Sequence, residues 1–270
     1  MIPPAFDLVR AGSVEEAVAL LAEHGDDAKL IAGGHSLIPM MKLRLAFPSV
    51  LIDVRPVRDA AYIRTEGDDV AIGALTRHCD LVGSDLLRAE APLIPLTAAH
   101  VGDPQIRHRG TIGGSVSHAD PAADLPAAVL AADATLVLQG PGGRRSVPAT
   151  EFFLGYFETA LRSDEMLVEV RIPRNPGAKA HYEKFVRRAN DWAIVGIATT
   201  GGRVALANMG SRPLRATATE AALAGGASPA QAAAVAHEGT EPVTDMHADQ
   251  DYRRHLARVL TRRALEAVAA

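Results

Sequence analysis

Two glycine-rich segments of this chain combine the residue types that bind phosphate groups. They read Ala32-Gly33-Gly34-His35-Ser36 and Gly110-Thr111-Ile112-Gly113-Gly114-Ser115. Glycine lets a backbone come close to a phosphate and adopts positive φ angles without strain. A helix that begins at such a segment adds free N–H groups and the positive end of its dipole. A plain strand-to-helix turn also needs glycine, but two such segments, the second preceded by Arg107 and Arg109, could hold one diphosphate from both sides through amides and hydroxyls.

The spacing of these glycines excludes the commonest nucleotide motifs. A P-loop needs Gly-Lys-Ser/Thr after four spacer residues, and a Rossmann fingerprint needs G-x-G-x-x-G. Neither segment has either pattern, and the second is followed by HADPAAD over 118–124. In that stretch His118 and Asp120 lack a third ligand for a metal ion. Asp124 lies near an expected helix start, where it either caps the helix or accepts hydrogen bonds from the hydroxyls of a ribityl or ribose chain.

The elements that must position these segments predict an α+β protein. Residues 1–55 predict a small α/β unit, with helices over 13–25 and 36–45 and strands over 28–32 and 50–54. The middle of the chain predicts a hairpin over 61–65 and 70–74, helical pieces over 76–101, a loop over 102–121, a helix over 122–132, and strands over 135–139 and 166–172. The tail predicts strands over 180–187, 194–199 and 204–209, then helices over 216–224, 228–237 and 250–268.

Composition and charge narrow the class of protein. The 270 residues carry a formal net charge of −4, which argues against nucleic acid as the main partner. The single cysteine, Cys79, excludes a disulfide framework, a zinc ribbon and a Cys-ligated iron–sulfur cluster within this chain. The start, MIPPAFDLVRAG, does not have the pattern of a signal peptide, and no apolar run is long enough to span a bilayer. We therefore expect a cytoplasmic protein with no membrane segment of its own.

Four stretches of the sequence resemble one known family. AGGHSL at 32–37, GTIGGS at 110–115, HADPAADLP at 118–126 and GSRPLRA at 210–216 resemble the FAD-binding subunit of molybdenum hydroxylases. The resemblance is greatest to the medium subunit of aerobic carbon monoxide dehydrogenase and its relatives, and the same flavin module occurs in xanthine dehydrogenase. It implies a two-subdomain PCMH-type FAD-binding domain over 1–175, with subdomains of about 1–55 and 56–175. A small domain over 176–270, a three-stranded antiparallel sheet with helices, would follow.

The resemblance also implies which residues bind FAD. They fall in the two glycine segments and at single positions elsewhere: Ile31, Ala32, Gly33, Gly34, His35, Ser36, Leu37, Val101, Thr111, Ile112, Gly113, Gly114, Ser115, Asp124, Leu167, Lys184 and Trp192. The two segments would hold the diphosphate from opposite sides. Many relatives have Asn where this chain has the shorter Ser115. We expect a bulky residue in place of Gly33 or Gly114 to weaken FAD binding, and Asp124→Ala to weaken it more mildly.

The single positions would contact other parts of FAD. Asp124 matches an acidic position at the polyol, and Leu167 matches an apolar contact with the rings. Lys184 matches a basic position near the flavin. Trp192 matches a position beside the isoalloxazine, although a core anchor in the second domain is an equal alternative for a tryptophan. Val101 is a weaker apolar candidate.

In this family the flavin subunit works with partners. The resemblance implies a large subunit that carries molybdopterin and hydroxylates the substrate, and a small subunit with two [2Fe–2S] clusters. Electrons would pass from molybdenum through the clusters to FAD and on to an external acceptor. A dimer of such heterotrimers is expected, with no catalytic acid, base or nucleophile and no metal site on this chain. The substrate and the acceptor cannot be read from this sequence.

Three alternatives stay open at this point. A stand-alone FAD-dependent oxidase or dehydrogenase of a small molecule would need a base beside the flavin, for which His35 is the best candidate. A scaffold subunit that has lost FAD is disfavoured by the intact glycines. A nucleotide-binding regulatory module would bind the same phosphates without redox chemistry, and an absorption spectrum would separate it from any flavoprotein.

Overall fold

The computed structural model describes residues 1–270, and the chain begins with a small parallel sheet. Its three strands run in the order β1-β3-β2. They are joined by two helices, with the bounds β1 (Asp7–Arg10), α1 (Val14–His24), β2 (Ala28–Ile31), α2 (Leu37–Lys42) and β3 (Val50–Asp53). The Ser13 hydroxyl accepts a hydrogen bond from the Glu16 amide and so starts α1. The expected elements of this unit are confirmed, and β1 adds to them, because its four mostly exposed residues show no periodic pattern.

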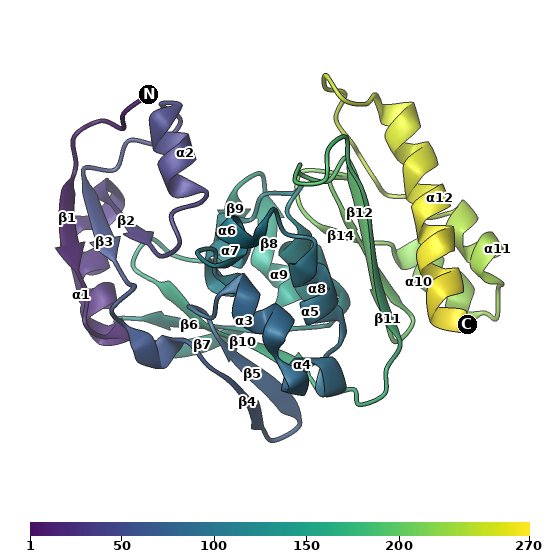
Figure 1. Cartoon of the computed structure of the whole chain (residues 1–270), viewed down its shortest axis with the longest axis horizontal. Coiled ribbons are helices and arrows are strands. Elements are labelled where there is room, and N and C mark those ends of the chain that lie inside the picture. The colour runs from purple at the N-terminus through teal and green to yellow at the C-terminus, as the bar shows by residue number, and fades with distance from the viewer.

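A five-stranded antiparallel sheet occupies the middle of the molecule (Figure 1). Its order is β4-β5-β10-β6-β7, with the bounds β4 (Ile63–Glu66), β5 (Asp69–Gly73), β6 (Thr135–Gly140), β7 (Gly143–Pro148) and β10 (Met166–Pro173). The expected hairpin and the expected strands at β6 and β10 are confirmed. The edge strand β7 adds to them, because its polar sequence GRRSVP carries little hydrophobic signal.

Helices between β5 and β6 pack on one face of this sheet. They are α3 (His78–Gly83), α4 (Asp85–Glu90), α5 (Leu93–Ala99), α6 (Pro104–Arg107), α7 (Ile112–His118) and α8 (Asp124–Ala131). Apolar side chains from this region form one buried cluster with Ile72, Leu136 and Val170 of the sheet. The expected loop over 102–121 is wrong, because α6 and α7 lie within it. Both begin at side-chain caps, Asp103 and Thr111, but are too short to show a helical period.

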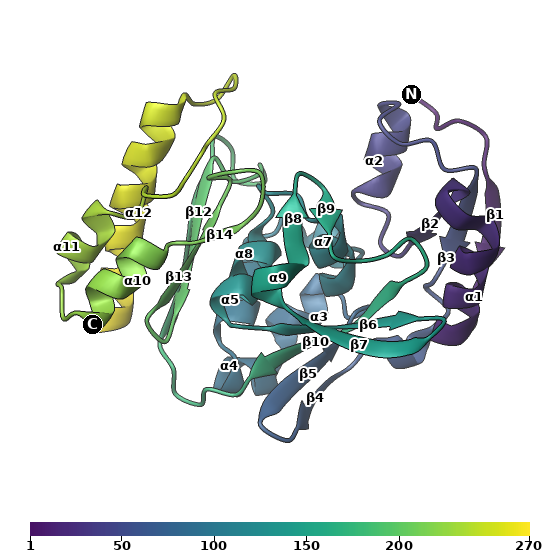
Figure 2. The same ribbon diagram turned by 180° about the vertical axis from the view of Figure 1, so that it is seen from behind.

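A short segment returns from β7 to the central sheet. It consists of α9 (Ala149–Phe152), β8 (Phe153–Gly155) and β9 (Glu158–Thr159), and the two strands pair as a small hairpin (Figure 2). Phe157, in the turn of this hairpin, has a φ of 53°, a conformation uncommon for a non-glycine residue.

The C-terminal part is a four-stranded sheet with helices on one face. The order is β11-β12-β13-β14, and the bounds are β11 (Ala180–Phe185), β12 (Val195–Thr200), β13 (Arg203–Ala207), β14 (Leu214–Arg215), α10 (Thr217–Ala224), α11 (Pro229–Ala234) and α12 (Gln250–Ala269). The sequence predicts three strands for this sheet, and the structure has four. The additional strand β14 has two residues after Pro213, too few to show an alternating pattern.

The two faces of the C-terminal sheet bury side chains of different size. Small residues, Ala198, Ala205 and Ala207, join the same cluster as α8 of the central part. Larger ones, including Ile197 and Leu206, pack with α12 on the other face. Because side chains alternate along a strand, one sheet serves both cores and fixes the C-terminal part against α8. No helix is both long enough and apolar enough to cross a bilayer.

Candidate functional site

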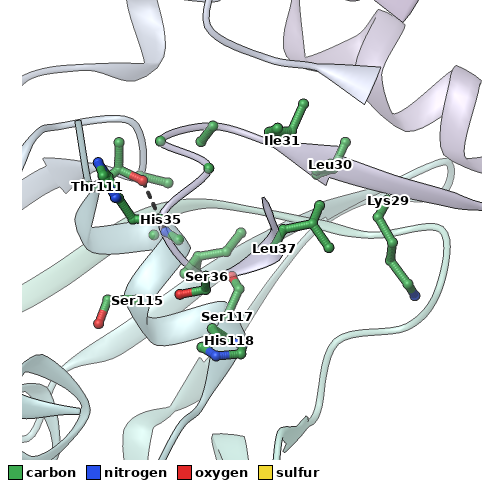
Figure 3. A pocket seen from close by; sticks show the side chains of 18 of the residues that line it. Lys29, Leu30, Ile31, His35, Ser36, Leu37, Thr111, Ser115, Ser117 and His118 are labelled. Atoms are coloured by element: carbon green, nitrogen blue, oxygen red, sulfur yellow. Dashed lines mark hydrogen bonds between the residues drawn. The ribbon is translucent and has the colours of Figure 1, made fainter. Parts of the chain in front are cut away.

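A large pocket lies where the N-terminal unit, the central part and one C-terminal loop meet. Its volume is about 640 Å³. The loop after β2 and helix α7 both line it, and Figure 3 shows Ser36 and Leu37 of the loop close to Ser115 and His118 of the helix. The β8–β9 hairpin, the start of β10 and Trp192 complete the lining.

The glycines of the two segments allow them to touch. A Cβ on Gly33 would lie 2.3 Å from the carbonyl oxygen of Arg109, and a Cβ on Gly113 would lie 2.6 Å from the carbonyl oxygen of Ala74. Gly34 has a φ of +78°, which a residue with a side chain adopts only under strain. The first segment is therefore pressed against the backbone that leads into the second, as the pairing of the two segments in the sequence predicts.

The first segment presents a run of free donors to the pocket. None of the backbone amides of Ala32–Ser36 donates a hydrogen bond within the protein. The Ser36 hydroxyl is free as well, because it does not cap α2. Backbone N–H groups in folded proteins are nearly always paired with protein, water or ligand. A continuous unpaired run along a pocket wall is therefore suited to the oxygens of a diphosphate.

The second segment differs from the sequence-based expectation. Four of its amides are already used inside the protein: Ile112 donates to Thr76 O (3.0 Å), Gly113 to Ala74 O (2.9 Å), Gly114 to Thr111 Oγ1 (3.1 Å) and Ser115 to Thr111 O (3.0 Å). The expectation that these glycine amides cradle phosphate is therefore wrong, because the Ala74 carbonyl after β5 takes the Gly113 amide and the N-cap Thr111 takes the Gly114 amide. What this wall offers is the hydroxyls of Ser115 and Ser117, together with the Thr111 amide, which has no acceptor within the protein.

The pocket brings together all of the expected residues except two. Ile112 is fully buried in the central core, and Lys184 is paired with Asp124 behind the wall. Trp192 lines the pocket and is 55% exposed, so the alternative of a core anchor is wrong. Lining residues that sequence reasoning did not single out for FAD include His78, Ser117, His118, Phe157 and Arg162. Ser117 and His118 lie one helical turn after Gly113 and Gly114 on α7, and this helix is too short for the sequence pattern to have found them.

Asp124 is the most buried charged group on the pocket wall. It is 4% exposed, its Oδ1 accepts a hydrogen bond from the Tyr182 hydroxyl (2.5 Å), and its Oδ2 lies 2.9 Å from Lys184 Nζ. Burial raises the pKa of Asp124, and Lys184 and Tyr182 oppose that rise. The capping alternative is wrong, because Ala123 is the N-cap of α8 and no side chain caps this helix.

His78 is a buried imidazole on the floor of the pocket. Gly110 leaves room for its ring, because a Cβ there would lie 2.7 Å from His78 Nε2. Its Nδ1 is buried and has no hydrogen-bond partner. Burial, with smaller contributions from His35 and Arg107, lowers the pKa of His78 to about 4.

This lowered pKa predicts a loss of stability in acid. The folded pKa lies below the ordinary value of 6.5, so the unfolded chain binds more protons between about pH 6.5 and 4. The free energy of unfolding should therefore fall through that window, by up to about 3 kcal/mol from this group. Urea unfolding of wild type and His78→Gln at pH 7 and pH 4.5 measures it. The pH dependence should be weaker in His78→Gln and unchanged in a control, His247→Gln, at an exposed histidine.

The lining fits FAD by its own chemistry. The lining includes the free amides of Ala32–Ser36, the hydroxyls of Ser115 and Ser117 on α7, and the carboxylate of Asp124. Ile31, Leu37 and Leu167 supply apolar surface for rings. The comparisons agree: residues 4–175 match the model of the FAD binding domain in molybdopterin dehydrogenase, and residues 180–268 match the CO dehydrogenase flavoprotein C-terminal domain.

The chain belongs to the FAD-binding subunits of molybdenum hydroxylases. It is 43% identical to the carbon monoxide dehydrogenase medium chain of Hydrogenophaga pseudoflava, over 99% of this chain and 98% of that one. It is 40% identical to the 6-hydroxypseudooxynicotine dehydrogenase complex subunit alpha of Paenarthrobacter nicotinovorans, over 98% and 95% of the two chains.

Solved structures of this hydroxylase family have the same fold. A chain of carbon monoxide dehydrogenase from Hydrogenophaga pseudoflava matches with a TM-score of 0.95 and 46% identity, over 100% of this chain and 99% of that one. A chain of quinoline 2-oxidoreductase from Pseudomonas putida 86 matches with a TM-score of 0.92 and 34% identity, over 100% and 98%. The family, the α+β fold and FAD as cofactor are thus confirmed. The chain is an oxidoreductase subunit, and the alternative of a regulatory nucleotide module is wrong.

Proposed function

We propose that this subunit carries electrons out of a molybdenum hydroxylase. A large partner with molybdopterin would hydroxylate the substrate, a small partner with two [2Fe–2S] clusters would pass the electrons on, and an external acceptor would take them from FAD. The single observation that carries the proposal is the pocket wall of free amides, Ala32–Ser36, in a chain of this family. The single cysteine supports clusters on another subunit, because a cluster of this kind needs several thiolate ligands.

Each wall of the pocket has a role in this proposal. The amides of Ala32–Ser36 and the Ser36 hydroxyl would bind the diphosphate, and the hydroxyls of Ser115 and Ser117 would bind it from α7. Asp124 would accept hydrogen bonds from the polyol, while Leu167 and Trp192 would lie at the ring end. Bound FAD supplies the change from single-electron to two-electron transfer, and the protein binds and orients it.

The substrate is proposed to be selected by the large partner. The relatives' names include carbon monoxide, glyceraldehyde and caffeine dehydrogenases. These substrates differ in size and chemistry, yet the matching chains share between 34% and 43% identity with this one over almost its whole length. A dimer of heterotrimers and a cytoplasmic location stay predictions, which light scattering of the purified complex and cell fractionation would test.

The test is a comparison of electron flow with and without FAD. The tagged full chain, expressed together with the proposed large and small partner chains, should copurify with both and show the visible flavin bands. Substrate should then reduce the clusters and an added dye acceptor. In a complex whose flavin has been removed, substrate should still bleach the clusters while dye reduction falls, and added FAD should restore it. Dye reduction at the full rate without flavin, or a chain that purifies alone and oxidises a substrate, would overturn the proposal.

A further inference from the structure

We propose that Tyr182 is a positioning residue for the cofactor: its hydroxyl fixes the Asp124 carboxylate in the orientation that accepts hydrogen bonds from the FAD polyol. The inference rests on the proposed contact between Asp124 and FAD. It assigns a role in that contact to the C-terminal part of the chain, whose strand β11 carries Tyr182 but supplies no residue to the pocket lining.

The geometry joins two parts of the protein through one carboxylate. Asp124 is the first residue of α8, and Tyr182 and Lys184 are two apart on β11, so both point from the same face of the strand. Each takes a different oxygen of Asp124: the Tyr182 hydroxyl at 2.5 Å from Oδ1, and Lys184 Nζ at 2.9 Å from Oδ2. With one donor on each oxygen, the carboxylate cannot rotate without breaking a hydrogen bond.

Gly196 makes room for the tyrosine hydroxyl. It lies on β12, paired with Lys184, and a Cβ at this position would be 2.7 Å from Tyr182 Oη. Glycine inside a strand is unfavourable and often marks a close approach of another group. Here that group is the phenol hydroxyl of Tyr182, and a side chain at position 196 would collide with it.

Tyr182 is suited to act as a permanent donor. It is 3% exposed, and burial raises the pKa of its hydroxyl well above the ordinary value. It therefore stays protonated and keeps donating to Asp124. Lys184 also donates to the carbonyl oxygen of His100 at 3.1 Å, which anchors the cluster to the end of α5. The remaining lone pairs of Asp124 are thus directed by groups that do not themselves line the pocket.

A matched pair of variants separates positioning from general stability. Tyr182→Phe removes only the hydroxyl. Tyr62→Phe is the control, because Tyr62 also donates at 2.5 Å to a buried carboxylate, Glu169, but lies outside the pocket. Titration of the full-length apoprotein with FAD, followed by flavin fluorescence, should give a Kd about tenfold higher for Tyr182→Phe, as expected for a lost hydrogen bond to a charged group. Tyr62→Phe should lower the melting temperature by a similar amount and leave the Kd unchanged.

Two further variants test whether the effect runs through Asp124 and Gly196. Asp124→Asn combined with Tyr182→Phe should bind FAD no more weakly than Asp124→Asn alone, because the hydroxyl acts only through the carboxylate. Gly196→Ala should raise the Kd in the wild-type background and have little effect in the Tyr182→Phe background, where the hydroxyl that it presses on is gone. A wild-type Kd in Tyr182→Phe, or additive losses in the double variant, would overturn the inference. A wild-type Kd in Asp124→Asn would instead overturn the proposed contact between Asp124 and FAD.

Discussion

Gly33→Ala is expected to raise the Kd for FAD on the order of a hundredfold, although it adds a single methyl group. The added Cβ would lie 2.3 Å from the carbonyl oxygen of Arg109 and 2.8 Å from its carbonyl carbon. Both are backbone atoms, so the contact cannot be relieved by a side-chain rotation. The loop must move away, and the amides of Ala32–Ser36 move with it. Overpacking of this kind costs a few kcal/mol, which corresponds to about two powers of ten in affinity.

Fluorescence titration and the flavin retained after desalting would measure the effect. The matched control is Gly142→Ala, in the β6–β7 turn, where an added Cβ meets nothing within 4 Å. It should bind FAD as wild type does. Gly114→Ala should lie between the two, because its Cβ meets only the Thr111 hydroxyl, at 2.9 Å. Full flavin occupancy in Gly33→Ala would show that the first segment does not hold the diphosphate.

The sequence predicts the same effect on FAD binding for substitutions at Gly33 and Gly114, whereas the structure predicts different effects. Local composition predicts that the first segment is a tight turn before a helix and that the second lies in a loop, because glycine and hydroxyl residues act within a few positions. It does not predict which amides are free. The amide of Gly113 is taken by Ala74, and Gly33 touches Arg109, each a partner far away in the sequence. Such contacts depend on how the sheet and the first unit pack, which no local pattern contains.

Dependence on contacts between distant residues also explains why some strands of the fold are not predicted from the sequence. Long elements with an apolar face, such as β10 and α12, are evident from the sequence, since the burial of that face leaves a periodic pattern. The edge strand β7 and the β8–β9 hairpin are polar or very short, and their pairing is decided by neighbours. The hairpin supplies Phe157 to the pocket, so part of the lining could not be predicted.

The burial of Lys184 changes the effect that is expected of a substitution at Asp124. The resemblance implies a basic group near the flavin, and a lysine on a strand has no predictable partner. In the structure its side chain is 5% exposed and paired with Asp124, which is 4% exposed. A buried ion pair contributes little net stability, but the loss of one partner leaves a charge buried alone. The sequence-based expectation of a mild effect for Asp124→Ala does not include this cost.

Asp124→Ala is therefore expected to lower the free energy of unfolding by about 3 to 5 kcal/mol, in addition to weakening FAD binding. The truncation leaves Lys184 Nζ with only the carbonyl oxygen of His100, and leaves the Tyr182 hydroxyl without an acceptor. Urea unfolding of the apoprotein measures the stability separately from the cofactor. Asp124→Asn should cost less, because the amide oxygen still accepts one hydrogen bond.

The double variant Asp124→Ala with Lys184→Met decides the cause of the loss. Removing the buried ammonium together with its partner leaves no uncompensated charge, and methionine fills most of the space of the lysine stem. The double variant should therefore be more stable than Asp124→Ala alone, although it should still bind FAD weakly because the polyol acceptor is missing. If the two substitutions add, the ion pair is not what Asp124 contributes to folding, and the destabilisation comes from the Tyr182 hydrogen bond or from the cavity. Restored stability without restored FAD binding would assign to Asp124 two separable roles, one in joining α8 to β11 and one in holding the cofactor.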